Sequence, residues 1–239
     1  MRIASWNLNH RARPRTIPGW IISEVAATKA DVMVCTEYVE GKSHRRFVSD
    51  LRAAGFLAVN TTPVTPGQNQ VLIASRASQE LGTLRPPSDI DETVPSNALH
   101  VSISGTHLIG FRMPAFNSSA EHLKRRTWQW VREAAAELRD TPALIVGDMN
   151  TQRGDPQRYC GDCIEILLGD GWSEVIPSSG YSWKHARSGT SRRIDYGFAS
   201  PRLIATNADY SWDFVARNAI AVSKAGIPDH ALLLIDVQP

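Results

Sequence analysis

Short apolar runs bounded by turn residues limit most strongly what this chain can fold into. Each run has about four to nine residues and is rich in Val, Ile, Leu and aromatic side chains, as β-strands are. The runs cover residues 2–9, 31–38, 56–62, 70–75, 98–104, 106–113, 143–150, 192–200 and 231–237. The chain is therefore predicted to build its core mainly from strands.

Three stretches predict helices instead, at residues 18–30, 44–55 and 118–140. Pro18 suits a first helical turn, and Gly55 suits a left-handed cap after a helix end. Many strands with few helices, and a hairpin-like pair at 97–103 and 106–112, favour a layered mixed α/β sandwich over a doubly wound sheet. With 239 residues, 42% of them hydrophobic, residues 1–239 are expected to form a single domain.

Charge and cysteine content exclude several classes. A net charge of +2 is too small for a purely electrostatic nucleic-acid binder, and the basic group in the third helix is expected to be a solvated face. Three cysteines give no disulfide framework, and Cys160 and Cys163 form a CxxC without a nearby partner motif for zinc. No run of about 20 apolar residues is present, so we expect no membrane association and a cytoplasmic protein.

Polar side chains stand at the ends of five of the apolar runs. The groups are Asn7 with Asn9, Glu37, Asp148 with Asn150, Asp195, and Asp229 with His230. Residues two apart in a strand point to the same face, which makes each Asn or Asp pair a same-side pair. We expect the strands to deliver these groups to one shared mouth.

Carboxylate and carboxamide oxygens without thiolates suit a hard divalent ion. Mg²⁺ is the expected cofactor and Mn²⁺ its substitute. His230 is the only histidine next to one of these acids, which favours a catalytic role over a structural hydrogen bond.

The segments SWNLN, DVMVCTEY, VGDMN, SRRIDYGFAS and PDHALLLIDV follow one another in the chain. In this order, from residue 5 to residue 237, the chain resembles the exonuclease/endonuclease/phosphatase superfamily of DNase I-like metal phosphoesterases. The resemblance implies a DNase I-like four-layered α/β sandwich, with two packed mixed β-sheets flanked by helices. It also implies a metal-dependent hydrolase that cleaves phosphoester bonds.

The same resemblance implies a role for each polar group. Glu37 would ligate the metal, with Asn7, Asn9 and Asp229 in or near its coordination sphere. Asp148 would orient and deprotonate the attacking water, helped by Asn150, which would also contact the phosphate. His230 would donate to a phosphate oxygen and Asp195 would hold its other ring nitrogen. These roles match what hydrolysis of an anionic diester requires.

Two positions depart from the family pattern. Arg112 stands where relatives usually place Tyr or His, and it is kept as a catalytic candidate because Arg can stabilise negative charge. A guanidinium that stays protonated is a poor general acid, so metal-bound water is the alternative proton donor for the leaving group. Arg192 stands where abasic-site endonucleases usually carry Trp, which disfavours that activity. His107, further back on the same strand, is expected to be structural.

Basic residues flank the expected mouth and favour a polyanionic substrate, because Lys and Arg contacts to phosphate supply most non-specific nucleic-acid affinity. The candidate substrate contacts are Arg11, Arg13, Arg46, Arg153, Trp183 and Arg192. A nuclease acting on DNA or RNA is therefore the favoured function.

Three alternatives stay open. A phosphatase or phospholipase-type enzyme would act on a small or lipid phosphoester. A non-catalytic binding module would keep the fold, although Glu37, Asp148 and His230 are all present. The strand-end groups could also only cap turns, with Asp195 paired to Arg192 or Arg193 at the surface.

Overall fold

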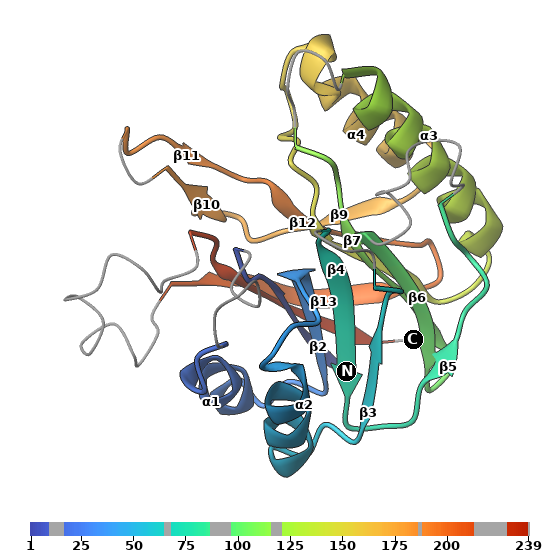
Figure 1. The fold of residues 1–239 in the computed structure, drawn as a ribbon. Coiled ribbons are helices and arrows are strands. Elements are labelled where there is room, and N and C mark those ends of the chain that lie inside the picture. Colours follow the sequence, from blue (N-terminus) through green and yellow to red (C-terminus); the bar gives the residue numbers. More distant parts are fainter. Residues whose placement is uncertain are drawn as a thin grey trace.

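A computed structural model describes residues 1–9, 17–64, 68–86, 97–115, 121–185, 188–212 and 229–238. Two six-stranded sheets pack against each other, and helices cover the outer face of each sheet (Figure 1). The predicted four-layered sandwich of two mixed sheets flanked by helices is confirmed.

The first sheet has the strand order β13-β14-β1-β2-β4-β3. Its strands are β13 (Ile204–Ser211), β14 (Leu232–Gln238), β1 (Arg2–Asn7), β2 (Val32–Tyr38), β4 (Gln70–Ser75) and β3 (Ala58–Thr61). Only β1 and β2 run parallel; the other neighbours are antiparallel. The parallel pair brings the ends of β1 and β2, which carry Asn7 and Glu37, to the same edge.

The second sheet has the order β5-β6-β7-β8-β12-β9. Its strands are β5 (Glu80–Leu81), β6 (Ala98–Ile103), β7 (Thr106–Arg112), β8 (Ala143–Asp148), β12 (Asp195–Ala199) and β9 (Ser173–Val175). Here β7 and β8 are the parallel pair, and their register places Arg112 opposite Asp148. Antiparallel β12 places Asp195 on the other side of Asp148.

A small hairpin of β10 (Trp183–Lys184) and β11 (Ser191–Arg192) extends from the sandwich beyond the start of β12 (Figure 1). An isolated bridge joins Trp183 to His230 and ties the hairpin to the chain just before β14.

Helices α1 (Trp20–Ala27) and α2 (His44–Ala53) cover the first sheet, and α3 (Glu121–Leu138) and α4 (Gly161–Gly169) cover the second. A short 3-10 turn, Gln157–Tyr159, precedes α4. Helix α2 ends as predicted: Gly55 has φ +94° and donates to Arg52 O, while Phe56 donates to Leu51 O, the pair of bonds of a Schellman cap.

Aliphatic side chains from both sheets form the central core, and the sheets approach closely at Gly110. A Cβ on Gly110 would lie 2.8 Å from a methyl of Val34 and 2.9 Å from one of Val71, both on the facing sheet. This contact requires a residue without a side chain, since core atoms are already close-packed.

All nine predicted strands and all three predicted helices are present, with shifted ends. The sequence did not predict β5, β9, β10, β11, β13 or α4. Strand β13 was missed because five of its eight residues are exposed, which removes the apolar alternation. In the parts of the chain that the structure describes, no helix is long and apolar enough to cross a bilayer.

The prediction that the basic residues of α3 form a solvated face is wrong for Lys124. Lys124 is fully buried, and its ammonium donates to Asn150 O at 2.5 Å. Lys124 lies at helical spacing from the buried residues Trp128 and Val131, so it belongs to the apolar face of the helix.

Candidate active site

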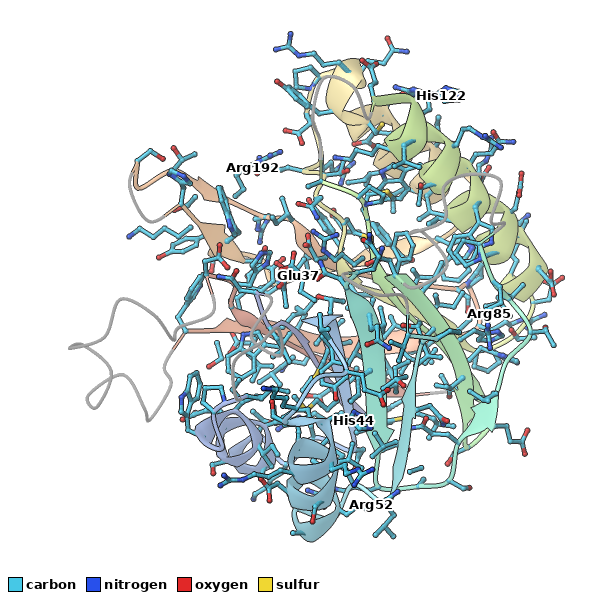
Figure 2. All side chains as sticks on the ribbon, in the orientation of Figure 1. Glu37, His44, Arg52, Arg85, His122 and Arg192 are labelled. Atoms are coloured by element: carbon cyan, nitrogen blue, oxygen red, sulfur yellow. The ribbon has the colours of Figure 1, made fainter. Side chains whose placement is uncertain are left out.

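The polar ends of the two sheets meet at one place. Asn7, at the end of β1, donates from its Nδ2 to Asp148 Oδ2 of the other sheet at 2.9 Å. A pocket of roughly 250 Å³ opens beside this contact. Its lining is formed by Asn9, Glu37, Arg112, Ala115, Asp148, Asn150, Trp183, Arg192, Ile194, Asp229 and His230. Figure 2 shows Glu37 on the side of the molecule from which the β10–β11 hairpin extends.

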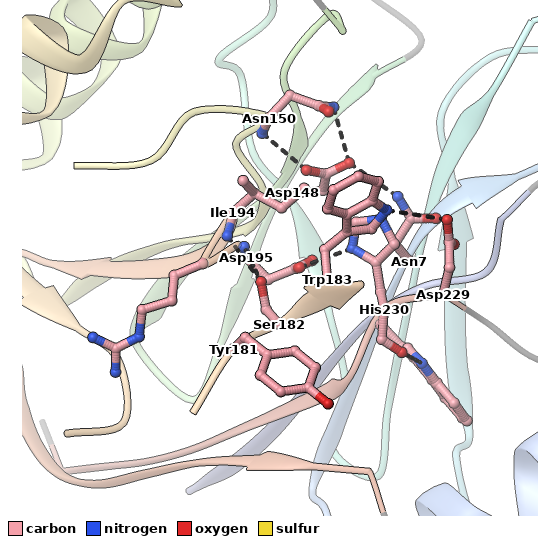
Figure 3. Close-up of polar contacts among 12 residues, drawn as sticks. Asn7, Asp148, Asn150, Tyr181, Ser182, Trp183, Ile194, Asp195, Asp229 and His230 are labelled. Atoms are coloured by element: carbon pink, nitrogen blue, oxygen red, sulfur yellow. Dashed lines mark hydrogen bonds and ion pairs between the residues drawn. The ribbon is translucent and has the colours of Figure 1, made fainter. Parts of the chain in front are cut away.

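Asp148 is 1% exposed and is held by three hydrogen bonds (Figure 3). Its Oδ2 accepts Asn7 Nδ2 and Asn150 Nδ2, each at 2.9 Å, and its Oδ1 accepts the Asn150 backbone N–H at 2.9 Å. Burial raises the pKa of Asp148 to about 6, although the charge of His230 opposes the shift. The carboxylate is therefore fixed in orientation and titrates just below neutral pH.

His230 and Asp195 form a buried pair beside Asp148. His230 Nδ1 lies 2.8 Å from Asp195 Oδ2, and the two residues are 6% and 1% exposed. Burial lowers the pKa of His230, but the charge and hydrogen bond of Asp195 outweigh it and raise the pKa to about 10. The imidazole is then a cation at neutral pH that donates one N–H to Asp195.

Backbone and hydroxyl contacts fix both members of this pair. Ser182 Oγ accepts the backbone N–H of Ile194 at 2.8 Å and that of Asp195 at 2.9 Å, and the Tyr210 hydroxyl donates to Asp195 O at 2.7 Å. Trp6 Nε1 donates to His230 O at 3.1 Å. The alternative of a surface ion pair for Asp195 is wrong, because its carboxylate is buried against His230.

A bulge in β2 directs Glu37 into the pocket. The register of β2 with β4 shifts between Cys35 and Tyr38, and Glu37 has a left-handed φ of +51°. Such a φ is uncommon for a residue other than Gly and is often found at functional sites. A bulge re-aims the side chain that it carries.

Arg112 forms an ion pair with Glu37. Its Nη2 lies 2.8 Å and its Nε 2.9 Å from Glu37 Oε1, and the two side chains are 15% and 10% exposed. The residue that departs from the family pattern thus contacts the carboxylate expected to bind the metal.

Asp229 and Trp183 close another side of the pocket. Trp183 Nε1 donates to Asp229 Oδ2 at 3.1 Å (Figure 3). Lys184 N donates to Asp229 O at 3.2 Å. The hairpin and the segment before β14 therefore hold each other in place.

Turns, and not the predicted strand alternation, bring Asn7 together with Asn9 and Asp148 together with Asn150. Strand alternation does not explain them, since β1 ends at Asn7 and β8 at Asp148. Asn9 has φ +50° and donates its N–H to Asn7 Oδ1 at 2.8 Å, and Asn150 has φ +44° and makes the same kind of bond to Asp148. These are turns closed by a side chain, which Asn accommodates well.

The donor atoms of the pocket fit a hard cation. Asp148, Asp195 and His230 offer atoms that lie within 4.8 Å of one another. His230 Nδ1 is hydrogen-bonded to Asp195, however, and Asp148 already accepts three N–H groups. The oxygens of Glu37, Asp229 and Asn9, which line the same pocket, are therefore the better candidates for metal ligands. Arg112 beside Glu37 shows that this carboxylate is already matched to a positive charge.

The predicted basic rim is only partly present. Arg192 lines the pocket and forms an ion pair with Asp155. Arg46 is 76% exposed in its side chain and lies near Asp50 on α2, and Arg153 binds Glu165 at 2.6 Å; neither lines the pocket. The structure does not bring these two side chains to the site. Arg11 and Arg13 lie outside the described residues.

Sequence reasoning missed several residues that support the site, among them Lys124, Ser182 and Tyr210. Lys124 donates to the carbonyl of Asn150 and so supports the turn that holds Asp148. The signal was present, since a single Lys interrupted the apolar face of the predicted helix. Ser182 and Tyr210 carried no comparable signal. His107 Nδ1 lies 3.0 Å from His100 Nε2, a contact that fits the predicted structural role of His107.

A family model described as the endonuclease/exonuclease/phosphatase family matches residues 4–224. The chain belongs to this family. The expected resemblance is therefore confirmed, and with it the prediction of a hydrolase, at the level of the family.

Solved structures of family-like proteins share the fold. An AP endonuclease from Archaeoglobus fulgidus superposes with a TM-score of 0.76 at 20% identity over 100% of both chains. A 3′ phosphatase from Neisseria bound to a product DNA hairpin gives 0.72 at 17% identity over 100% of both chains. A 3′-5′ exonuclease from Neisseria meningitidis gives 0.71 at 18% identity over 99% of both chains. No curated protein sequence matches the chain closely enough to serve as a relative.

Proposed function

We propose that this family member is a metal-dependent phosphodiesterase that hydrolyses nucleic acid. The observation that carries the proposal is the buried Asp148, held by three N–H groups beside the His230–Asp195 pair, in one pocket with Glu37. A base, a cationic donor and a candidate metal carboxylate are the parts that diester hydrolysis needs.

Glu37 would hold Mg²⁺ or Mn²⁺, together with Asp229 and Asn9. When bound, the ion supplies positive charge to the phosphate and so lowers the cost of the developing negative charge. Asn7 donates from its Nδ2 to Asp148 and accepts the backbone N–H of Asn9 with its Oδ1. These two bonds favour a positioning role for Asn7 over the predicted role as a metal ligand.

Asp148 accepts the proton of the attacking water. Above its pKa of about 6 it is deprotonated, and its three hydrogen bonds leave it no freedom to turn away from the pocket. Asn150 donates from its Nδ2 to Asp148 Oδ2 and to Met113 O, each at 2.9 Å, so its main contribution is to orient the base. Its contact with the phosphate stays a prediction.

His230 donates the N–H on the far side of its ring to a non-bridging phosphate oxygen. Asp195 holds Nδ1, which fixes the angle of the ring and keeps it charged. A donor fixed before the reaction stabilises the transition state without reorganisation.

Nucleic acid as the substrate is supported by three features. Arg112 and Arg192 line the pocket, and Trp183 offers an aromatic ring there on which a base could stack. The Neisseria 3′ phosphatase of the same fold is bound to DNA. Removal of a terminal phosphate is the second candidate, because the fixed charge of Arg112 favours a dianionic monoester. We keep the single domain over residues 1–239 and the cytoplasmic location as proposals.

A substrate panel tests the function. Single-stranded DNA, duplex DNA, RNA, a 3′-phosphorylated oligonucleotide, phosphoinositides and bis(p-nitrophenyl) phosphate would each be offered with Mg²⁺ or Mn²⁺. The matched variants are Asp148→Asn and Asp140→Asn, of which the second changes an exposed residue outside the pocket. We expect nucleic acid to be cleaved, Asp148→Asn to abolish cleavage and Asp140→Asn to retain it.

Two results would contradict the proposal. Turnover restricted to lipid or small phosphoesters, not inhibited by DNA, would favour the phosphatase or phospholipase alternative. Binding of nucleic acid without turnover of any ester would favour a non-catalytic module.

A further inference from the structure

We propose that Cys160 and Cys163 form a redox-active dithiol, a modification site that exchanges with small-molecule disulfides such as oxidised glutathione. Cys160 is the N-cap of α4 and Cys163 lies in its first turn, where Cys163 N donates to Cys160 O at 3.1 Å. This spacing at a helix start brings two sulfurs close enough to be joined.

Positive charge surrounds the pair. Arg125 Nη1 lies 3.7 Å from Cys163 Sγ and is held there by Asp162 at 3.0 Å and by Gln157 O at 2.7 Å. The hydrogen bond from Cys163 lowers the pKa of Cys160, and the charges of Arg125 and Lys124 act in the same direction. Cys160 is therefore the member of the pair that loses its proton more readily, and it is buried, whereas its hydrogen bond to Cys163 raises the pKa of Cys163. The thiolate is the reactive form, so the accessible Cys163 must pass its proton to Cys160 before it attacks.

One thiol of the pair is accessible. Cys163 is partly exposed and lines a groove of roughly 230 Å³ between α3 and α4, together with Arg125, Trp128 and Ile166. Cys35, by contrast, is fully buried in the core, and burial raises its pKa. Among the described residues, no His, Asp, Glu or further Cys joins the two thiols in a metal-binding group.

The exchange balances with the external disulfide as oxidant. One sulfur of the pair attacks a sulfur of the external disulfide and expels one thiol, which takes up a proton. The second sulfur then attacks the first, the protein disulfide forms, and the second external thiol leaves with the other proton. The dithiol loses two electrons and the external disulfide gains them.

The charge of Cys160 also acts on Lys124, a residue that supports the candidate active site. Burial lowers the pKa of Lys124, and among the neighbouring charges that of Cys160 opposes this shift most strongly; Lys124 in turn donates to Asn150 O. Oxidation removes this negative charge from the surroundings of the buried ammonium, which donates to Asn150 O. We therefore infer that the disulfide form turns over more slowly, by about tenfold, which corresponds to about 1.4 kcal/mol in the barrier. This step rests on the proposed function.

Intact mass and thiol counting test the site without any assay of activity. The folded protein is equilibrated with glutathione buffers from fully reduced to fully oxidised, quenched with acid, and titrated for thiols after denaturation. We expect the loss of two hydrogen atoms and a fall from three free thiols to one in the wild type, and the same mass change with a fall from two free thiols to none in Cys35→Ser. Cys160→Ser should trap a glutathione adduct on Cys163.

Three free thiols at every buffer ratio would overturn the site, and so would a stable glutathione adduct on the wild-type protein without closure of the disulfide. Rates of the oxidised and reduced forms test the coupling. Equal rates with a closed disulfide would overturn the coupling alone. A closed disulfide with no turnover in either form would instead contradict the proposed function and leave the dithiol standing.

Discussion

Replacing Arg112 by Gln is predicted to strengthen the binding of Mg²⁺. The Arg112 guanidinium contacts Glu37 Oε1 through two nitrogens, at 2.8 and 2.9 Å, and the two side chains are 15% and 10% exposed. If Glu37 is the main metal ligand, the cation must share or displace that guanidinium.

The size of the effect follows from the charges. Two unit charges about 4 Å apart attract by about 4 kcal/mol at the effective dielectric constant of about 20 that suits partly buried pairs. Only part of this is recovered, because Gln also hydrogen-bonds and water enters. We expect the Kd for Mg²⁺ to fall by about ten- to a hundredfold, which corresponds to about 1.4 to 2.8 kcal/mol.

Isothermal titration calorimetry with MgCl₂ and MnCl₂ measures this directly, with no need for substrate. Arg112→Lys keeps the charge but not the planar fork, so its Kd should lie between those of the wild type and Arg112→Gln. Arg85→Gln is the matched control, since Arg85 is exposed and lies away from Glu37 (Figure 2). An unchanged or weaker Mg²⁺ affinity in Arg112→Gln would refute the competition at Glu37.

Three further predictions follow from the protonation states of the histidines and of Asp148. His230→Gln should lower kcat by about 10²-fold, the usual loss of one transition-state donor, whereas His122→Gln on the exposed side of α3 should leave it unchanged. The pH profile of kcat/KM should rise through about pH 6 as Asp148 loses its proton and fall toward about pH 10 as His230 loses its own; a rate independent of pH from 5 to 8 would contradict the base role. Burial and the neighbouring charges of His107 and Arg85 lower the pKa of His100 to about 4, so between that value and the usual 6.5 the unfolded chain binds more protons. The contribution of His100 to the free energy of unfolding, at most about 3 kcal/mol, should be complete above pH 6.5 and lost as the pH falls to 4. Denaturant unfolding at several pH values should show this loss in the wild type but not in His100→Gln.

The sequence predicted the parts of the fold that depend on local pattern. Runs such as 70–75 and 143–150 combine a strand-like composition with clear boundaries, and their strands formed with ends within two residues of the prediction. Helix α4 and strand β13 were missed because α4 is short and β13 is mostly exposed, so neither shows a strong apolar period. Such elements are stabilised mainly by tertiary contacts.

The convergence of the polar groups was predictable because strand ends at one edge of a sheet must lie together. The partners of the charged side chains were not. Arg153 was expected at the mouth but binds Glu165, and Lys124 was expected in solvent but is buried against Asn150. A long side chain can reach several partners, and the choice depends on burial and neighbouring charge, which sequence spacing does not record.

The central claim is that Glu37 makes this pocket a metal-dependent phosphodiesterase site. The most direct test is the Mg²⁺ dependence of single-stranded DNA cleavage by the wild type, by Glu37→Gln and by Glu40→Gln, which changes an exposed acid three residues away. The account predicts that Glu37→Gln loses cleavage by about 10²-fold or more at low Mg²⁺ and recovers part of it at high Mg²⁺, while Glu40→Gln follows the wild-type curve. Cleavage by Glu37→Gln at the wild-type rate and the same Mg²⁺ midpoint would contradict it.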